Sequence, residues 1–277
     1  MARAERRGTA SATAQYFAEM VRTLREQAGL TQEEVGKRIN YTGAAISALE
    51  NCKQLPGEKM LAGLEDVLGG GAGLLQMAGK YLVLDRYPPY FKDYVLLEAA
   101  ALNVSSYQTL VIDGLFQTEE YARAVLRCGF PPRNEEEVGQ LADARMDRKA
   151  LFDRKPVPLI ELVLEESALR RQIGTHEVMR AQLAHLAECA ARRNVTVQVI
   201  PLNRGARGEH AGLDGPMKLI ETPEHHHLVY LESQRKSLLI SDREEVSALA
   251  TRYAMIRAQA LGPDESLDLI ERLAGER

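Results

Sequence analysis

The stretch LREQAGLTQEEVGKRINYTGAAISALENCKQLP (Leu24–Pro56) decides the fold of the N-terminal part of the chain. Gly29 ends a first amphipathic helix, and Thr31 begins a second one with a capping box that Glu34 completes. A break of three residues follows, and Thr42 is the expected N-cap of a third helix. Two short helices joined by such a turn form a helix-turn-helix, whose later helix enters the major groove of DNA.

The sequence on either side predicts a small helical bundle around this motif. Apolar side chains recur at steps of three and four residues from Thr13 to Ala28, and again from Met60 to Leu68. The run Gly69–Gly71, with Gly73 behind it, then marks a domain boundary. The expected core residues inside the motif are Val35, Ile39, Ile46 and Leu49.

The motif resembles the Xre and phage-repressor class of helix-turn-helix proteins, whose LR…GLTQEE, IS-LE and following Pro it matches. The resemblance implies that Gln32 contacts the DNA backbone, that four residues at the start of the third helix face base edges, and that two at its end touch phosphate. The four are Thr42, Gly43, Ala44 and Ser47, and the two are Asn51 and Lys53. Glu50 matches a position that is mainly structural.

Cys52 departs from the pattern of that class, which commonly has Gly there in a left-handed conformation. We expect Cys52 either to adopt this conformation, at a cost of roughly 1 kcal/mol, or to close the helix with a different turn.

The charge of this region leaves an alternative open. Residues 14–69 contain six basic and eight acidic side chains, a formal charge of −2, whereas DNA-binding modules are usually basic. The alternative is a helical bundle that binds proteins and no DNA. Residues 1–12 are expected to form a flexible basic tail, in which Arg3, Arg6 and Arg7 serve as a minor-groove arm. The small side chains of the third helix favour relaxed specificity, with DNA shape carrying more of the discrimination.

The whole chain is predicted to be α+β, with an all-α, phage-repressor-like domain followed by a larger mixed domain. We expect a helix-turn-helix domain at residues 13–69, a linker and helical connector at 70–102, and an α+β domain at 103–277. The expected strands are Ser106–Val111, Val157–Leu164, Val195–Ile200, Met217–Glu221, Leu228–Glu232 and Leu238–Ile240. The expected helices after residue 103 are Glu119–Leu126, Asn134–Phe152, His176–Arg192, Arg243–Leu261 and Ser266–Leu273.

The second part has a resemblance of its own. YFKDYVLLEAAALNVSSYQTLVIDGLFQTEEYARAVL (Tyr90–Leu126) and later segments such as VTVQVIP are similar to the C-terminal domain of actinobacterial WhiJ-like regulators. The chain departs from that group by having Asp113 before Gly114, where Pro is usual. The resemblance implies a transcription factor, often encoded beside a small partner protein and in some cases antitoxin-like.

Two charged segments of the second part are candidate ligand sites. Glu165, with Arg170 and Arg171, could bind an ionic ligand, although complementation of a helix dipole explains the same pattern. Arg204, Arg207 and His210 lie in a glycine-rich loop that could hold an anion, although a plain flexible loop is the alternative.

Metal, cofactor and catalytic sites are not predicted. The run from His225 to His227 fits an exposed turn better than a metal site, since adjacent residues of an extended chain point to opposite faces. The sequence shows no Ser-His-Asp, Cys-His or P-loop pattern, so an enzyme in the second part is the least supported hypothesis.

Composition sets the remaining limits. The chain is 45% hydrophobic and 27% charged, with three widely spaced cysteines and no apolar run long enough to span a bilayer, which favours the cytoplasm. A net charge of −4 argues against indiscriminate nucleic-acid binding by the whole surface.

The sequence therefore predicts a regulator that binds double-stranded DNA at a two-fold operator as a homodimer. Its second part would dimerise and sense a ligand or a small protein partner. The alternative is an antitoxin-like module that sequesters a small co-encoded protein.

Overall fold

The computed structural model describes residues 12–84, 87–206 and 208–276, and the chain divides into two compact units, Met1–Pro89 and Tyr90–Arg277. Arg3, Arg6, Arg7 and Arg207 lie outside the described residues. The expected connector over residues 70–102 is shared between the two units, because its first helix packs within one and its second helix belongs to the other.

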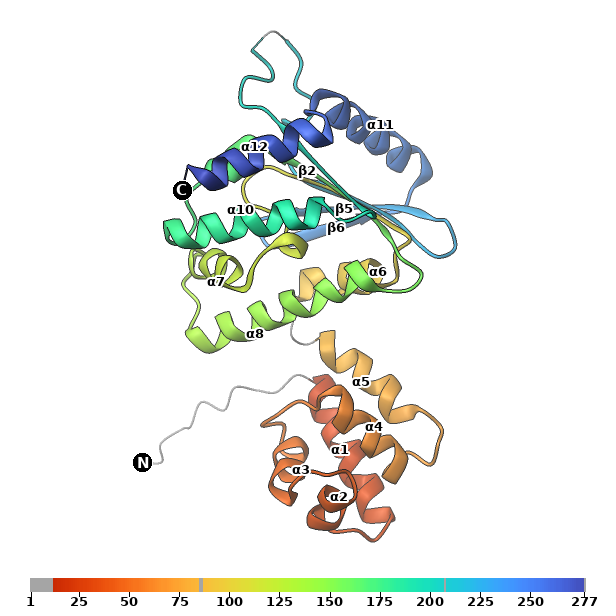
Figure 1. The fold of residues 1–277 in the computed structure, drawn as a ribbon. Coiled ribbons are helices and arrows are strands. Elements are labelled where there is room, and N and C mark those ends of the chain that lie inside the picture. The colour runs from red at the N-terminus through yellow and green to blue at the C-terminus, as the bar shows by residue number, and fades with distance from the viewer. Residues whose placement is uncertain (1–11, 85–86, 207, 277) are drawn as a thin grey trace, which may run out of the picture. The chain divides into compact units, whose positions relative to one another are not determined.

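The first unit is a bundle of helices (Figure 1). Their bounds are α1 Ala12–Gln27, α2 Gln32–Arg38, α3 Gly43–Glu50, α4 Glu58–Leu68 and α5 Leu74–Leu84. One cluster of apolar side chains joins all of them, and its most deeply buried members are Phe17, Val21, Val35, Ile46, Leu64 and Leu75. Since α5 packs against α1 and α4, the helical bundle continues past the glycine run and through α5.

The second unit is built on a sheet whose described strands run in the order β3-β2-β1-β4-β5-β6. The strands are β1 Asn103–Gln108, β2 Leu159–Glu165, β3 Val195–Ile200, β4 Met217–Glu221, β5 His227–Ser233 and β6 Lys236–Ile240. The first three pair in parallel through helical crossovers, and β4, β5 and β6 add to β1 as an antiparallel meander.

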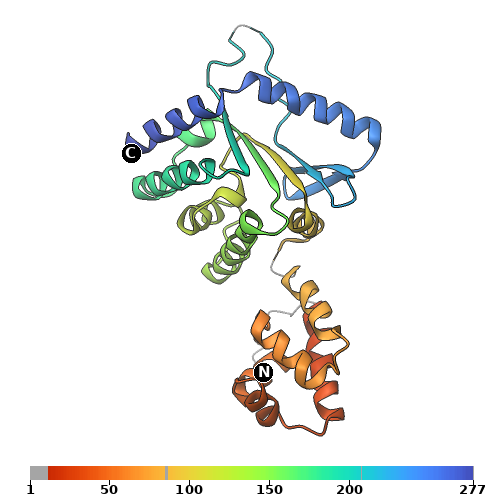
Figure 2. The same ribbon diagram turned by 45° about the vertical axis from the view of Figure 1, so that its right-hand side comes forward.

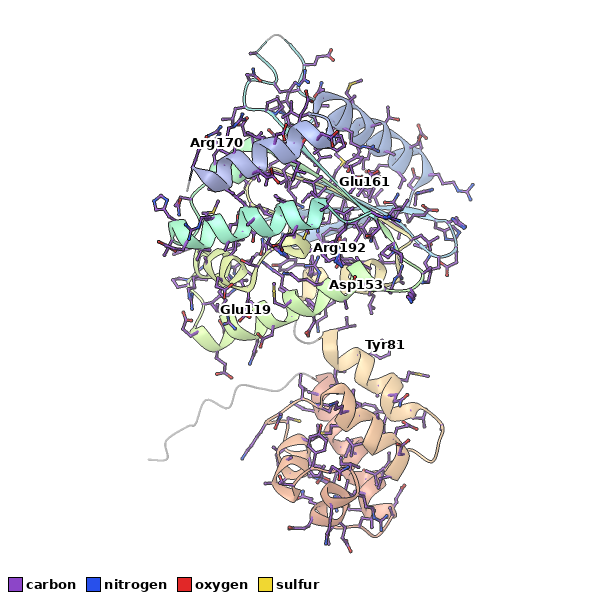
Figure 3. The ribbon with its side chains drawn as sticks, viewed as in Figure 1. Tyr81, Glu119, Asp153, Glu161, Arg170 and Arg192 are labelled. Atoms are coloured by element: carbon purple, nitrogen blue, oxygen red, sulfur yellow. The ribbon has the colours of Figure 1, made fainter. Side chains whose placement is uncertain are left out.

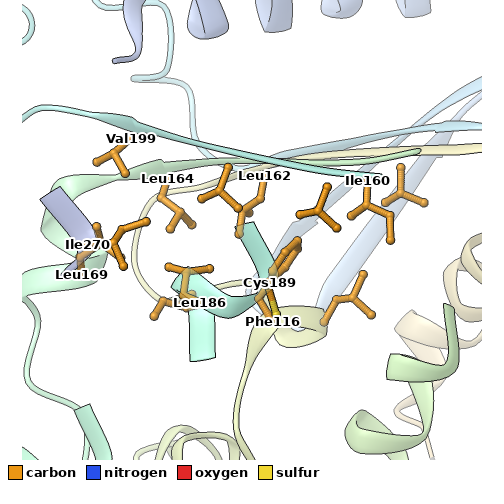
Figure 4. Close-up of a cluster of buried hydrophobic side chains, with 14 of the residues drawn as sticks. Phe116, Ile160, Leu162, Leu164, Leu169, Leu186, Cys189, Val199 and Ile270 are labelled. Carbon is orange, nitrogen blue, oxygen red and sulfur yellow. The ribbon is translucent and has the colours of Figure 1, made fainter. Parts of the chain in front are cut away.

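Helices cover both faces of this sheet, with α11 on one face and the other long helices on the opposite face (Figure 2). The helices of this unit are η1 Pro89–Phe91, α6 Lys92–Ala100, η2 Gly114–Phe116, α7 Glu119–Arg127, α8 Glu135–Asp147, η3 Arg148–Asp153, α9 Glu166–Arg170, α10 His176–Ala190, α11 Arg243–Gln259 and α12 Pro263–Gly275. The larger core lies between the sheet and α10, where Leu162, Leu164 and Leu186 are fully buried (Figure 4).

The predicted fold class is confirmed, and most predicted strands and helices lie within a few residues of their expected bounds. The α-helix expected over Asn134–Phe152 is wrong in its last five residues, because α8 ends at Asp147 and the chain changes to the 3-10 helix η3 at Arg148. Arg148 forms a buried ion pair with Glu98 of α6. A contact between elements far apart in sequence leaves no periodic signal that predicts it.

Candidate nucleic-acid interface

The turn between α2 and α3 is closed by backbone hydrogen bonds and by a glycine. The Tyr41 N–H donates to the Gly36 carbonyl oxygen at 2.7 Å, and Asn40 takes the left-handed conformation with φ of 61°. A Cβ on Gly36 would lie 2.8 Å from the carbonyl carbon of Thr42. Only glycine allows the backbones of α2 and the turn to approach this closely.

Side-chain caps start both helices of the motif. The Thr31 hydroxyl accepts from the Glu34 N–H, and the Glu34 carboxylate accepts from the Thr31 N–H at 2.7 Å, which confirms the predicted capping box. The Thr42 hydroxyl accepts from the Ala45 N–H at 3.2 Å, as expected for the N-cap of α3. The Thr42 hydroxyl therefore has a structural task in addition to its predicted contact with a base edge.

The start of α3 presents a small surface. Ala44 is exposed and Ser47 is partly exposed, while Ile46 and Leu49 anchor the helix in the core. Gly43 packs closely on α2, because a Cβ at this position would lie 3.1 Å from the Cα of Glu33. Backbone, methyl and hydroxyl groups are therefore what α3 and its N-cap can offer at this exposed start.

A buried carboxylate holds α1, α2 and α3 together. The Glu50 side chain is fully buried and accepts from Arg25 Nε at 2.6 Å and from Gln32 Nε2 at 2.8 Å. Arg22 donates to the Glu50 carbonyl oxygen at 3.0 Å. Burial raises the pKa of Glu50, but the hydrogen bonds from Arg25 and Gln32 and the nearby arginine charges outweigh it, so that the pKa is lowered.

This network bears on Gln32, which was assigned to the DNA backbone. One amide N–H of Gln32 is used by Glu50, so the side chain is oriented by the protein before DNA arrives. Its predicted DNA contact stays a prediction, for which the remaining amide atoms are available. The structural role expected of Glu50 has a physical cause that the sequence did not reveal, namely the two arginines on α1.

The end of α3 carries the two residues assigned to phosphate, and both Asn51 and Lys53 are exposed. Cys52 between them adopts the left-handed conformation with φ of 54°. The N–H groups of Cys52 and Lys53 donate to the carbonyl oxygens of Leu49 and Ala48 at 2.9 and 2.8 Å, which is the Schellman closure. Of the two options open to Cys52, the chain uses the left-handed turn.

Several acidic side chains of the first unit accept hydrogen bonds from other residues of that unit. Besides Glu50 and Glu34, the buried Glu65 accepts from the N–H groups of Gly73 and Leu75 at 2.6 and 2.8 Å and so caps the start of α5. The formal charge of −2 belongs to residues 14–69 alone, and the burial of Glu65 removes one of those negative charges from their surface.

The ligand residues predicted in the second unit separate into different contacts. Glu165 and His210 come together, with Oε1 and Nε2 3.3 Å apart, and the Tyr107 hydroxyl donates to Glu165 at 2.5 Å. Arg170 of α9, labelled in Figure 3, pairs with Glu166 of the same helix, and Arg204 donates to the carbonyl oxygen of Gln259. Arg170 and Glu166 form an i, i+4 ion pair that includes neither Glu165 nor Arg171.

The remaining candidates do not add to a common site. Arg171 is exposed at the end of α9. His225 Nδ1 lies 2.6 Å from Glu221 Oε1 across the β4–β5 turn, and no group of three metal-ligating side chains occurs among the described residues.

Sequence reasoning missed two buried ion pairs in the second unit. Arg148 donates to both carboxylate oxygens of Glu98, at 2.6 and 2.7 Å, and Lys218 lies 2.6 Å from Asp113. Burial would raise the pKa of Asp113, but the charges of Lys218 and Arg148 lower it strongly. The available signal was Glu98 inside the apolar run of α6, since a charge there requires a partner.

The comparisons with known proteins agree with this division of the chain. The model of a helix-turn-helix domain matches residues 17–76, and the model described as domain of unknown function (DUF5753) matches residues 91–272. No curated protein and no solved structure matches the chain. Among the described residues, no helix is both long and apolar enough to cross a membrane. The first match supports a DNA-binding regulator of the helix-turn-helix type, and the second covers most of the chain, which therefore belongs to the DUF5753 family.

Proposed function

We propose that the chain is a sequence-specific transcriptional regulator of the Xre type and of the WhiJ-like, actinobacterial kind. It acts in the cytoplasm as a homodimer on a two-fold operator, whose half-sites lie about one helical turn, roughly 34 Å, apart. The observation that carries the proposal is the α2–α3 motif, in which α3 is capped at Thr42 and held from behind by the buried Glu50 network.

The proposed contacts follow from the exposed groups. The N-terminus of α2 offers free backbone N–H groups and the positive end of a helix dipole to a phosphate, beside Gln32. Asn51 and Lys53 would bind phosphate at the other end of the motif, and Arg3, Arg6 and Arg7 would enter the minor groove. Since Ala44 and Ser47 are short, direct readout is limited and DNA shape contributes more to specificity.

In this proposal the second unit dimerises, senses a ligand or a small protein, and carries out no chemical step. Tyr90–Arg277 is a compact unit separate from the DNA-binding motif, so it can receive a signal without taking part in DNA contact. Its buried ion pairs give it charged groups whose balance a ligand can alter.

Adding a negative charge at the exposed start of α3 tests the interface. We expect Ala44→Glu to abolish the gel shift of the chain's own promoter fragment. The DNA phosphates would repel the added carboxylate, and its larger side chain would keep the backbone of α3 from approaching the DNA closely. Because Ala44 is exposed, the larger side chain disturbs no core packing. The midpoint temperature of thermal unfolding of the variant should therefore stay within a few degrees of that of the unaltered chain.

The matched control is Gln76→Glu, which adds the same charge at an exposed position of α5. It should retain the shift, and the affinity of the unaltered chain should fall steeply with salt. Equal loss in both variants would mean that net charge, and not this face, governs binding. Retention of the shift by Ala44→Glu would overturn the assigned face.

The second candidate function is an antitoxin-like module that sequesters a small co-encoded protein. A groove of about 440 Å³ between α10 and α12 favours it, because alanines make up most of its lining and Leu267, Glu188 and Glu271 complete it. Co-expression with the neighbouring gene product distinguishes the two. A complex that survives Ala44→Glu but not Ala187→Arg supports sequestration through this groove, and the absence of any complex contradicts it.

A further inference from the structure

The two edges of the sheet differ in what covers them. At the β3 edge, the Val199 N–H donates to the Ser266 hydroxyl at 3.0 Å, and the Val199 carbonyl oxygen accepts from the Leu261 N–H at 2.9 Å. The start of α12 therefore occupies hydrogen-bonding groups of that edge. Among the described residues, none forms a backbone hydrogen bond with the outer side of β6, which ends the strand order. The chain protects one edge of its sheet and leaves the other open.

The hairpin between β5 and β6 sets which backbone groups of β6 point outward. Its turn has two residues, so Ser233 and Lys236 form the hydrogen-bonded pair next to the turn. Hydrogen-bonded and non-hydrogen-bonded pairs alternate along an antiparallel ladder. The N–H and C=O groups of Ser237 and Leu239 therefore point away from β5, at the open edge.

Both faces of β6 carry exposed apolar side chains. Leu238 lies opposite Leu231 of β5, on the face that α11 packs against, and is 55% exposed. Leu239 lies opposite Tyr230, on the other face, and is 40% exposed. An edge strand with free backbone groups and exposed leucines on both faces is a template for pairing with another strand.

The strand β6 is complementary to a second copy of itself. In an antiparallel pair whose two-fold axis passes at Leu239, the outward groups of the two Leu239 residues bond each other, and Ser237 lies opposite Ser241 of the second copy. Lys236 then lies opposite Asp242 of the second copy. The backbone of Asp242 is extended, and its side chain caps α11 through Oδ1 and not Oδ2. This register uses every outward backbone group of β6 and places a cation beside a carboxylate at each end.

The charges on either side of β6 favour the antiparallel direction. The turn before the strand carries Arg235 and Lys236, whereas the segment after it, Asp242–Glu245, contains three acidic residues and one basic residue. An antiparallel pair brings the basic turn of one copy to the acidic segment of the other, twice across the two-fold axis. A parallel pair would place like charges together.

We propose that β6 pairs with β6 of a second copy of this chain, so that the two sheets form one continuous sheet across a two-fold axis. Such an interface is isologous, because each copy contributes the same strand. The inference rests on the proposed function in one respect, since it names the surface through which the second unit dimerises.

Sedimentation equilibrium of the full chain tests the surface. The unaltered chain should be a dimer, and Leu239→Glu should raise the dissociation constant of the dimer at least about tenfold, because it places two carboxylates directly opposite each other. Leu110→Glu is the matched control, since it adds the same charge at a leucine that is 64% exposed in the loop after β1. It should leave the dissociation constant unchanged.

Disulfide formation tests the register, in a chain whose exposed native thiol is removed by Cys128→Ser. Leu239→Cys should form a disulfide-linked dimer on mild oxidation, since the Cα atoms of such a hydrogen-bonded pair lie about 5.5 Å apart. Ser237→Cys is the control, because the same position of the second copy lies four residues further along the strand, about 13 Å away. Equal cross-linking of the two variants, or none in Leu239→Cys, would contradict the register.

Failure of this inference differs from failure of the proposed function. A dimer that keeps its dissociation constant in Leu239→Glu is joined through another surface, which overturns the inference and leaves the proposed homodimer intact. An unaltered chain that sediments as a monomer contradicts both the pairing of β6 and the proposed homodimer. Loss of the dimer in Leu110→Glu as well as in Leu239→Glu would mean that net charge, and not the β6 edge, governs association.

Discussion

At the scale of single residues, Cys52 shows how a fold pattern tolerates an exception. The Schellman closure of α3 requires a left-handed residue after Asn51, and Cys52 supplies it with φ of 54°. Its sulfur atom lies 3.5 Å from the carbonyl oxygen of Ala14, a weak contact that offsets little of the strain. The chain therefore carries a cost at this position that the usual glycine would avoid.

Replacing Cys52 by glycine should stabilise the first unit by about 1 kcal/mol, because glycine adopts positive φ without the steric penalty. Denaturant unfolding followed by helical circular dichroism measures this difference. Cys52→Ala is the control, since it removes the thiol but keeps the strained Cβ. The strain argument fails if the glycine variant is no more stable than the alanine variant.

At the scale of elements, the α2–α3 pair depends on backbone contact more than on side-chain packing. Gly36 lies directly against the turn, and Gly43 lies against the start of α2. The predicted boundaries of both helices are accurate because caps and turn residues are local signals. Gly36 was not singled out from the sequence, since a glycine inside a short helix says nothing by itself about what approaches it.

We expect Gly36→Ala to destabilise the first unit by about 2–3 kcal/mol and to reduce DNA binding. The added Cβ would meet three backbone atoms at 2.8–2.9 Å, and backbone cannot move as a flexible side chain can. Gly57→Ala is the matched control, because a Cβ there meets nothing within 4 Å. Similar losses of unfolding free energy in both variants would show that helix propensity or capping, and not this contact, is responsible.

At the scale of the whole molecule, each unit contains a buried carboxylate with a lowered pKa, Glu50 in the first and Asp113 in the second. A lowered folded-state pKa contributes stability that is present above the unfolded pKa, about 4 for these groups. That stability is lost as pH falls through the folded-state pKa. Both units should therefore weaken in acid, although their net charges and folds differ.

Glu50→Gln tests whether the carboxylate of Glu50 makes the stability of the first unit depend on pH. We expect the variant to lose about 3 kcal/mol of unfolding free energy at pH 7, because Arg25 loses its buried partner. Between pH 5 and pH 3, about the range in which the carboxylate titrates, its stability should fall less than that of the unaltered chain. Urea unfolding across this pH range measures both, and an unchanged pH slope would show that Glu50 is not the titrating group.

The sequence by itself determined the elements of this protein. Caps, glycine positions and apolar periodicity are properties of neighbouring residues, so they predicted the helix-turn-helix, the strands of the sheet and the α+β class without tertiary information. The family resemblance, and not these patterns, assigned Thr42, Ala44 and Lys53 to the DNA-facing part of the motif, and all three are exposed.

Only the tertiary structure decided how charges are paired. Glu50 meets Arg25 across 25 positions of sequence, and Arg148 meets Glu98 across 50, so no periodic pattern could connect them. Local sequence sets local geometry, whereas the balance of buried charge depends on which distant groups the fold brings into contact.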